Sequence, residues 1–185
     1  MDKKVTIWGQ IKSVLWTHLY MSLITMAFGF GAFWWFIMQN NWKQLFSGIC
    51  LAIYFCMMYT KGTKIASQDR RESSATKSYA LKGVVLGIAL GAVTFLLWLL
   101  YRMTWLYMTI DGGISGYSGV VYNFVFMIWT FCYHGFLGLF KGGMYWYMHI
   151  AIYVFPILAL GLGYFAGMKE FSFTAAFNKR LYEKE

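Results

Sequence analysis

Long stretches without charge are the feature that most limits what this chain can fold into. Residues 16–38 form a run of 23 residues that contains no Asp, Glu, Lys or Arg. A helix of that length covers about 35 Å, which exceeds the roughly 30 Å of hydrocarbon in a bilayer. Three further apolar runs occupy residues 42–60, 83–101 and 145–166. We therefore expect lipid, not water, to surround most of the chain.

Composition supports helices in this setting. Of the 185 residues, 59% are apolar and 12% are charged, whereas about 25% are charged in an ordinary soluble domain. The chain has one proline and lacks the short alternating segments that are typical of a barrel. The predicted fold class is an all-α integral membrane protein, a polytopic helix bundle that forms a single domain over residues 1–185.

Residues 120–140 decide how often the chain crosses. This segment is apolar enough to span, but it contains Asn123, Thr130 and His134 together with two glycines. We expect a re-entrant or interfacial segment beside four transmembrane helices. Five spans are the alternative.

The distribution of Lys and Arg favours four spans. In that arrangement the N-terminus, the loop 61–82 and the tail 168–185 lie on one side and carry 13 of the 16 basic residues, against 3 on the other side. Five spans would divide them 10 to 6. Because basic residues near span ends stay in the cytoplasm, we predict a multi-pass protein of the cell membrane with both termini cytoplasmic.

Two rows of small residues predict close helix packing. Such rows, spaced by four, let another backbone approach and gain dispersion contacts. With four spans both rows lie at one depth and can pack on each other; a protein partner or a second copy could also cover them. The rows consist of Gly83, Gly87 and Gly91, and of Ala159, Gly163 and Gly167.

Ionisable groups indicate where a ligand site would lie. No predicted span contains a carboxylate, which disfavours proton-coupled or sodium-coupled transport. We assign no catalytic or metal-binding residue. The polar side chains expected to converge near the outer membrane surface, and so to form a ligand-binding site, are Arg102, Asp111, Asn123, His134 and His149.

Two enzymatic alternatives are weighed against this expectation. His134 and His149 would supply two imidazoles to a haem if their segments were adjacent, but histidines at an interface more commonly bond to a carbonyl group or water. Gly116, Tyr117, Ser118 and Gly119 form a GxSG motif that resembles the serine motif of rhomboid intramembrane proteases. The resemblance implies Ser118 as nucleophile with His149 or His134 as base. It covers four residues within a glycine-rich loop, so we expect neither activity and no cofactor.

The net charge of +9 bears on partners. In a membrane protein such an excess reflects orientation and attraction to anionic lipids at the cytoplasmic face, so we expect no nucleic acid partner. The leading functional hypothesis is a non-enzymatic subunit, or an accessory or binding component, of a membrane complex. The alternatives are a small transporter or the membrane-embedded substrate-binding component of one, and an intramembrane enzyme.

Overall fold

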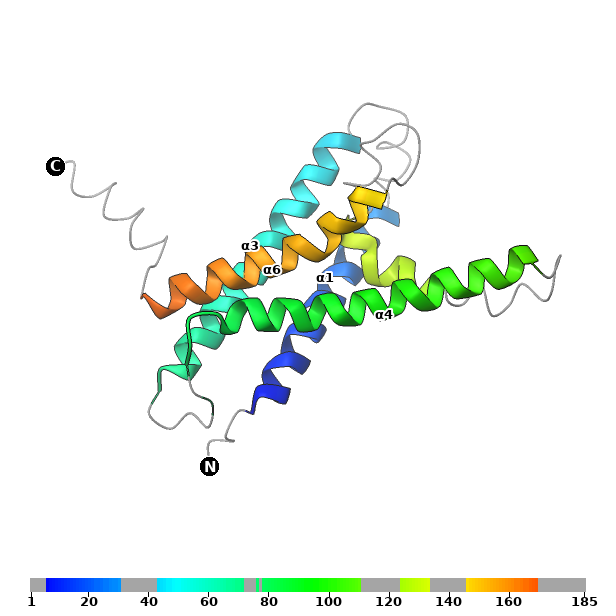
Figure 1. The fold of residues 1–185 in the computed structure, drawn as a ribbon. Coiled ribbons are helices and arrows are strands. Elements are labelled where there is room, and N and C mark those ends of the chain that lie inside the picture. Colours follow the sequence, from blue (N-terminus) through cyan, green and yellow to red (C-terminus); the bar gives the residue numbers. More distant parts are fainter. Residues whose placement is uncertain are drawn as a thin grey trace.

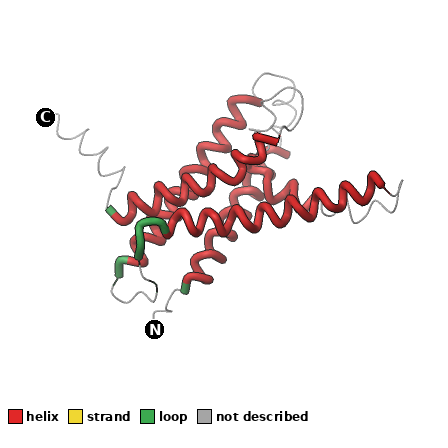
Figure 2. The backbone as a smooth tube through the Cα atoms, in the orientation of Figure 1, coloured by secondary structure: helices red, strands yellow, loops and turns green. Residues whose placement is uncertain are grey.

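The computed structural model describes residues 6–30, 43–71, 76, 78–110, 124–133 and 146–169. These ranges contain four long helices and one short helix, with no strand among them (Figure 2). The predicted all-helical class is confirmed. The long helices are α1 (Ile7–Phe30), α3 (Lys43–Asp69), α4 (Lys82–Ile110) and α6 (Trp146–Met168), and the short helix is Phe124–Tyr133.

The long helices do not end where the apolar runs end. α3 continues to Asp69, so residues 61–69, which the sequence assigned to a loop, are helical. Lys61 and Lys64 end the apolar run, but lysine is a good helix former and does not end the helix. Of the residues described, Lys82–Met103 is the one segment that is long and apolar enough to cross a membrane; Phe124–Tyr133 and Ile152–Met168 are shorter apolar helices.

α6 lies between α3 and α4 in the bundle (Figure 1). On the α4 side, Gly83 faces the backbone of Leu160 and the side chain of Tyr164, and a Cβ on Gly87 would lie 2.6 Å from Ile157 Cα. These contacts step backwards along α6 as they advance along α4, so the two helices run antiparallel. Gly91 leaves more room, because its nearest contact is Tyr153 at 3.9 Å.

On its other side α6 runs parallel to α3. A Cβ on Gly163 would meet the carbonyl group of Tyr59, and one on Gly167 would lie 2.7 Å from Ala66 Cβ and 2.8 Å from Thr63 Cα. The expectation that the two small-residue rows pack on each other is therefore wrong. Two faces of α6 are used, and the row that contains Gly163 and Gly167 faces α3 while α4 packs against bulkier residues.

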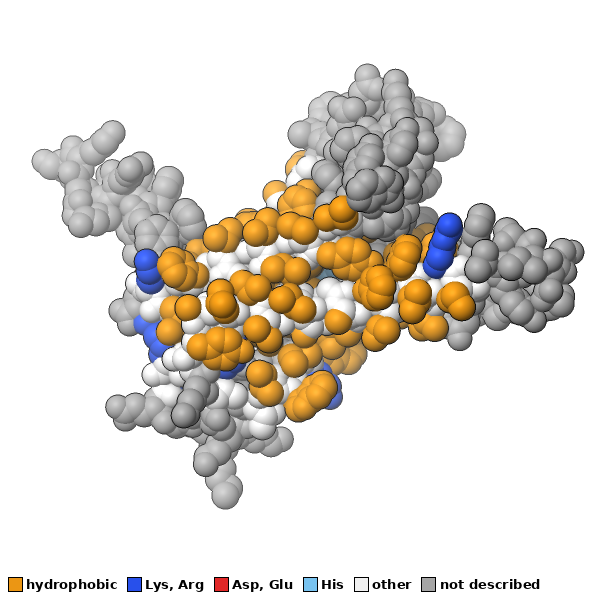
Figure 3. Space-filling view, viewed as in Figure 1, with side chains coloured by type: hydrophobic (Ala, Val, Ile, Leu, Met, Phe, Trp, Pro, Cys, Tyr) orange, Lys and Arg blue, Asp and Glu red, His pale blue; other side chains and the backbone are white. Residues whose placement is uncertain are grey.

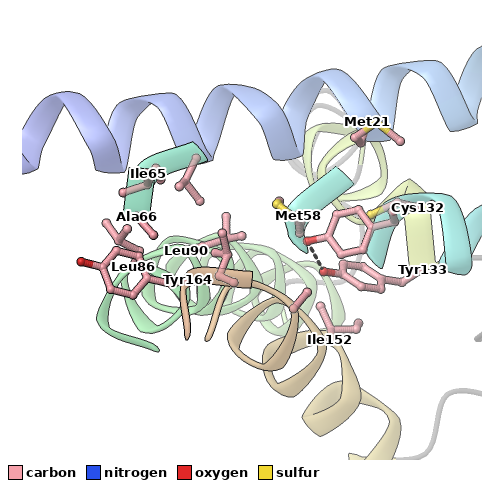
Figure 4. Packing of buried hydrophobic residues seen from close by; sticks show 14 residues of the cluster. Met21, Met58, Ile65, Ala66, Leu86, Leu90, Cys132, Tyr133, Ile152 and Tyr164 are labelled. Atoms are coloured by element: carbon pink, nitrogen blue, oxygen red, sulfur yellow. Dashed lines mark hydrogen bonds between the residues drawn. The ribbon is translucent and has the colours of Figure 1, made fainter. Parts of the chain in front are cut away.

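The buried core joins all five helices. It draws Val14 and Met21 from α1, and Figure 4 shows Cys132 and Tyr133 of the short helix beside Met58 of α3. Leu86 and Leu90 of α4 are buried in the same cluster as Tyr164 of α6. The short helix is thus packed into the bundle rather than laid on its surface.

Candidate functional site

The ligand site predicted from the sequence falls largely outside the described residues. Arg102 lies on α4 and is exposed. Asp111, Asn123 and His134 lie outside the described residues, as does the GxSG motif at 116–119, and the side chain of His149 in α6 is likewise not described. The predicted convergence of these five residues remains a prediction.

Polar side chains do meet at one end of the bundle, around Asp69. Asp69 Oδ1 accepts hydrogen bonds from Gln10 Nε2 at 2.7 Å and from Thr76 Oγ1 at 2.6 Å. Its Oδ2 accepts from Lys82 Nζ at 2.6 Å and from the Tyr164 hydroxyl at 3.0 Å. We call Gln10, Asp69, Thr76, Lys82 and Tyr164 the Asp69 cluster.

The Asp69 carboxylate is held in its charged form inside the protein. Burial raises the pKa of Asp69, but the hydrogen bonds donated by Lys82, Thr76, Gln10 and Tyr164 lower it more, and the net pKa is below its ordinary value. A buried carboxylate is stabilised when a cation and hydrogen-bond donors replace the water it has lost. Four donors fill both oxygens here, so this group is a structural tie rather than a proton donor or acceptor.

The Asp69 cluster brings four helix ends together. Gln10 lies in the first turn of α1, Asp69 ends α3, Lys82 begins α4, and Tyr164 lies near the end of α6. Thr6 caps α1 just before this point, because its hydroxyl accepts a hydrogen bond from the Gly9 N–H at 3.2 Å. The described part of the chain therefore starts and finishes at the same end of the bundle (Figure 1).

A second polar cluster lies deeper in the bundle, around His18. His18 Nε2 lies 2.9 Å from the Trp129 carbonyl oxygen, and Nδ1 lies 2.8 Å from the Tyr54 hydroxyl. A carbonyl oxygen only accepts, so Nε2 carries a hydrogen; in the neutral ring Nδ1 then accepts from Tyr54. The Tyr133 hydroxyl in turn donates to Tyr54 at 2.7 Å (Figure 4).

The short helix is fixed through Trp129 in this second cluster. Its carbonyl oxygen also accepts from Ser22 Oγ at 2.8 Å, and its indole N–H donates to Thr94 Oγ1 at 2.9 Å. The His18 cluster, which we define as His18, Ser22, Tyr54, Thr94, Trp129 and Tyr133, thus joins α1, α3, α4 and Phe124–Tyr133. Its members are neutral groups whose donors and acceptors form hydrogen bonds with one another. The cluster therefore holds these helices together.

The sequence contained a signal for part of both clusters. Gln10, His18, Ser22 and Thr25 follow one another at helical spacing, so they share one face of α1, and all four are buried. A polar stripe in a lipid-embedded helix predicts the face that meets other helices. Nothing comparable marked Asp69 or Lys82, since the sequence placed both in a solvated loop.

Comparison of the chain with protein-family models, with characterised proteins and with solved structures finds no match.

Proposed function

We propose that this chain is a multi-pass membrane protein that acts without catalysis, as a subunit or accessory component of a membrane complex. The observation that carries the membrane assignment is the inverted polarity of α1. Gln10 and His18 on its polar face are 2% and 1% exposed, while Trp8 and Trp16 are 76% and 60% exposed. Water would favour the opposite arrangement, because burying apolar area and solvating amide and imidazole groups both lower the free energy.

The other long helices support the same environment. Figure 3 shows apolar side chains covering the visible face of the described bundle. A soluble monomer rarely exposes an apolar surface of this extent. The exposed large apolar residues include Ile49, Ile53 and Met57 of α3, Ile88, Phe95, Leu96 and Leu99 of α4, and Val154, Leu158, Leu162 and Phe165 of α6.

The meeting of helix ends at the Asp69 cluster supports an even number of crossings. α1 and α4 begin at that cluster and α3 and α6 end there, so four passes that alternate in direction would return the chain to its starting side. The helix Phe124–Tyr133 would cover about 15 Å, which fits a re-entrant segment better than a fifth span. We infer that this end is cytoplasmic, because most described basic residues lie near it.

The packing of the two polar clusters supports a non-enzymatic role. In both clusters the side chains bond to one another across helices, and Gln10 Oε1 is the one buried side-chain oxygen or nitrogen without a partner among the described residues. Such groups hold a bundle in one arrangement. The wide apolar outer surface is then available to lipid and to other membrane chains.

Topology is tested by cysteine labelling in intact bacterial cells. Single cysteines are introduced as Lys3→Cys, Ser115→Cys and Lys184→Cys in a chain whose own Cys50, Cys56 and Cys132 are changed to Ala. We expect a membrane-impermeant maleimide to label Ser115→Cys in intact cells and the two terminal variants only after permeabilisation. Termini that label from opposite sides would overturn the four-span proposal.

The subunit role has its own test. The tagged chain is extracted in mild detergent from its native membrane, cross-linked, and measured by mass photometry and mass spectrometry. We expect an assembly of defined mass larger than the 21.5 kDa chain with reproducible partner peptides. A particle that contains one copy and no partner would contradict the proposal.

A further inference from the structure

Lys61 is a half-buried cation that reaches from α3 to α1. Its Nζ lies 2.6 Å from Ser13 Oγ. The Ser13 hydroxyl accepts this hydrogen bond, so its own hydrogen remains to be donated to another group. The pair therefore presents an ammonium and a hydroxyl side by side at the junction of two helices.

No carboxylate among the described residues balances this charge. Asp69 is the one described carboxylate, and Lys82 and three further donors occupy it. Lys64 lies near Lys61 and is exposed. Burial lowers the pKa of Lys61, and the charge of Lys64 lowers it further. Two lysines are thus held close together where an anion would relieve their repulsion.

The surface next to these lysines is apolar toward the middle of the bundle. Lys64, Lys61, Met57 and Ile53 follow one another by three or four residues, so they share one face of α3. Met57 and Ile53 are exposed, as is Trp16, which lies one turn after Ser13 on α1. The order along the surface is cationic group, then hydroxyl, then apolar side chains, which is the order that an anionic phospholipid complements.

We propose that Lys61, Lys64 and Ser13 bind the phosphate of an anionic phospholipid, with an acyl chain lying along Met57, Ile53 and Trp16. This inference rests on the proposed membrane location and names one lipid class for it. Each cation near the membrane surface contributes about fivefold to the binding of an anionic lipid. Phosphate oxygens also accept well from both ammonium and hydroxyl donors.

The test is lipid titration of the delipidated full chain in detergent, followed by native mass spectrometry. Phosphatidylglycerol and phosphatidylcholine with the same short acyl chains are compared. We expect phosphatidylglycerol to bind at least tenfold more tightly, Lys61→Gln and Lys64→Gln each to weaken it about fivefold, and Lys61→Arg to retain most of the affinity. Arg71→Gln, an exposed cation two residues after the end of α3, serves as the matched control and should leave binding unchanged.

Several results would overturn the lipid site. If Lys61→Gln and Lys64→Gln both bind phosphatidylglycerol as tightly as the unmodified chain, the phosphate binds elsewhere. An equal loss of affinity in Arg71→Gln would indicate unspecific charge attraction. Displacement of the lipid by inorganic phosphate at equal concentration would identify a free anion as the ligand. Unfolding midpoints of all variants without lipid report folding, and Lys64→Gln carries the test if Lys61→Gln does not fold. Cysteine labelling remains independent, so loss of the lipid site would leave the four-span proposal standing.

Discussion

Lys82 Nζ lies 2.6 Å from Asp69 Oδ2, and the two side chains are 1% and 0% exposed. The residues are 13 positions apart, at the start of α4 and the end of α3. Removal of one partner from a buried ion pair leaves a charge without compensation, which is more costly than loss of the pair itself. The Asp69 cluster is therefore expected to be sensitive to single substitutions.

Asp69→Asn should lower the free energy of unfolding by about 3 kcal/mol because it removes the carboxylate partner of the buried Lys82 side chain. Asp69→Asn combined with Lys82→Met should cost less than the sum of the two single changes, since no buried charge remains. The measurement is SDS-induced unfolding in mild detergent. Arg71→Gln, an exposed control at the same end, should change stability by less than about 0.5 kcal/mol; strictly additive effects would argue against coupling.

Low pH should weaken the interactions that Asp69 makes with Lys82 and the other donors of the Asp69 cluster. The pKa of Asp69 in the folded chain lies below its ordinary value of 3.8, so the unfolded chain binds the proton first as pH falls. The stabilisation is complete above the unfolded pKa and is lost as pH drops through the folded one. We expect the stability difference between the unmodified chain and Asp69→Asn to be constant from pH 7 to about pH 5 and to shrink below pH 3.8. A difference that stays the same at pH 3 would refute this.

Glycines at the helix contacts should not tolerate a methyl group. Gly163→Ala would press a Cβ against the Tyr59 carbonyl group, and such overpacking costs about 1–3 kcal/mol. Gly48→Ala is the matched control, because a Cβ there meets no described atom within 4 Å. The helix preference of alanine should make that control neutral or stabilising by up to about 1 kcal/mol. Thermal unfolding midpoints in detergent distinguish the two; equal midpoints would contradict the close α3–α6 contact.

The two tyrosines of the His18 cluster should differ in importance. Tyr54→Phe removes the donor to His18 Nδ1 and leaves a buried acceptor unpaired, so it should cost about 1–2 kcal/mol. Tyr133→Phe leaves the bond between Tyr54 and His18 in place and should cost about 0.6 kcal/mol. SDS-induced unfolding of each variant checks the order. A larger loss of unfolding free energy for Tyr133→Phe than for Tyr54→Phe would contradict the inference that Tyr54 donates to His18.

Local features of the fold could be predicted because they depend on neighbouring residues. Apolar runs and a single proline indicated helices, and α1, α3, α4 and α6 overlap the four predicted spans. The extension of α3 to Asp69 could not be predicted from the end of an apolar run. The last turn of α3 is held by hydrogen bonds that Asp69 accepts from Gln10, Lys82 and Tyr164. These three residues belong to other helices.

Helix pairing depended on the tertiary structure. Small residues at 83, 87, 163 and 167 indicated close approach but not the partner, because a glycine face accepts any helix whose side chains fit it. The structure places α6 between α3 and α4, with Gly163 on Tyr59 and Gly87 on Ile157. The candidate site also depended on the tertiary structure. Arg102, which the sequence placed in a ligand site, is exposed, and the Asp69 cluster was not predicted.

The sequence by itself determined that the chain is helical, and its spacing of Gln10, His18, Ser22 and Thr25 already contained one polar face of α1 that was not used as a prediction. Only the tertiary structure decided that, on this face, Gln10 forms a hydrogen bond with Asp69 and His18 forms one with Tyr54. Apolar helix surfaces pack with little preference, whereas a buried charge or imidazole requires particular partners. Those partners become known only once helices distant in sequence lie together.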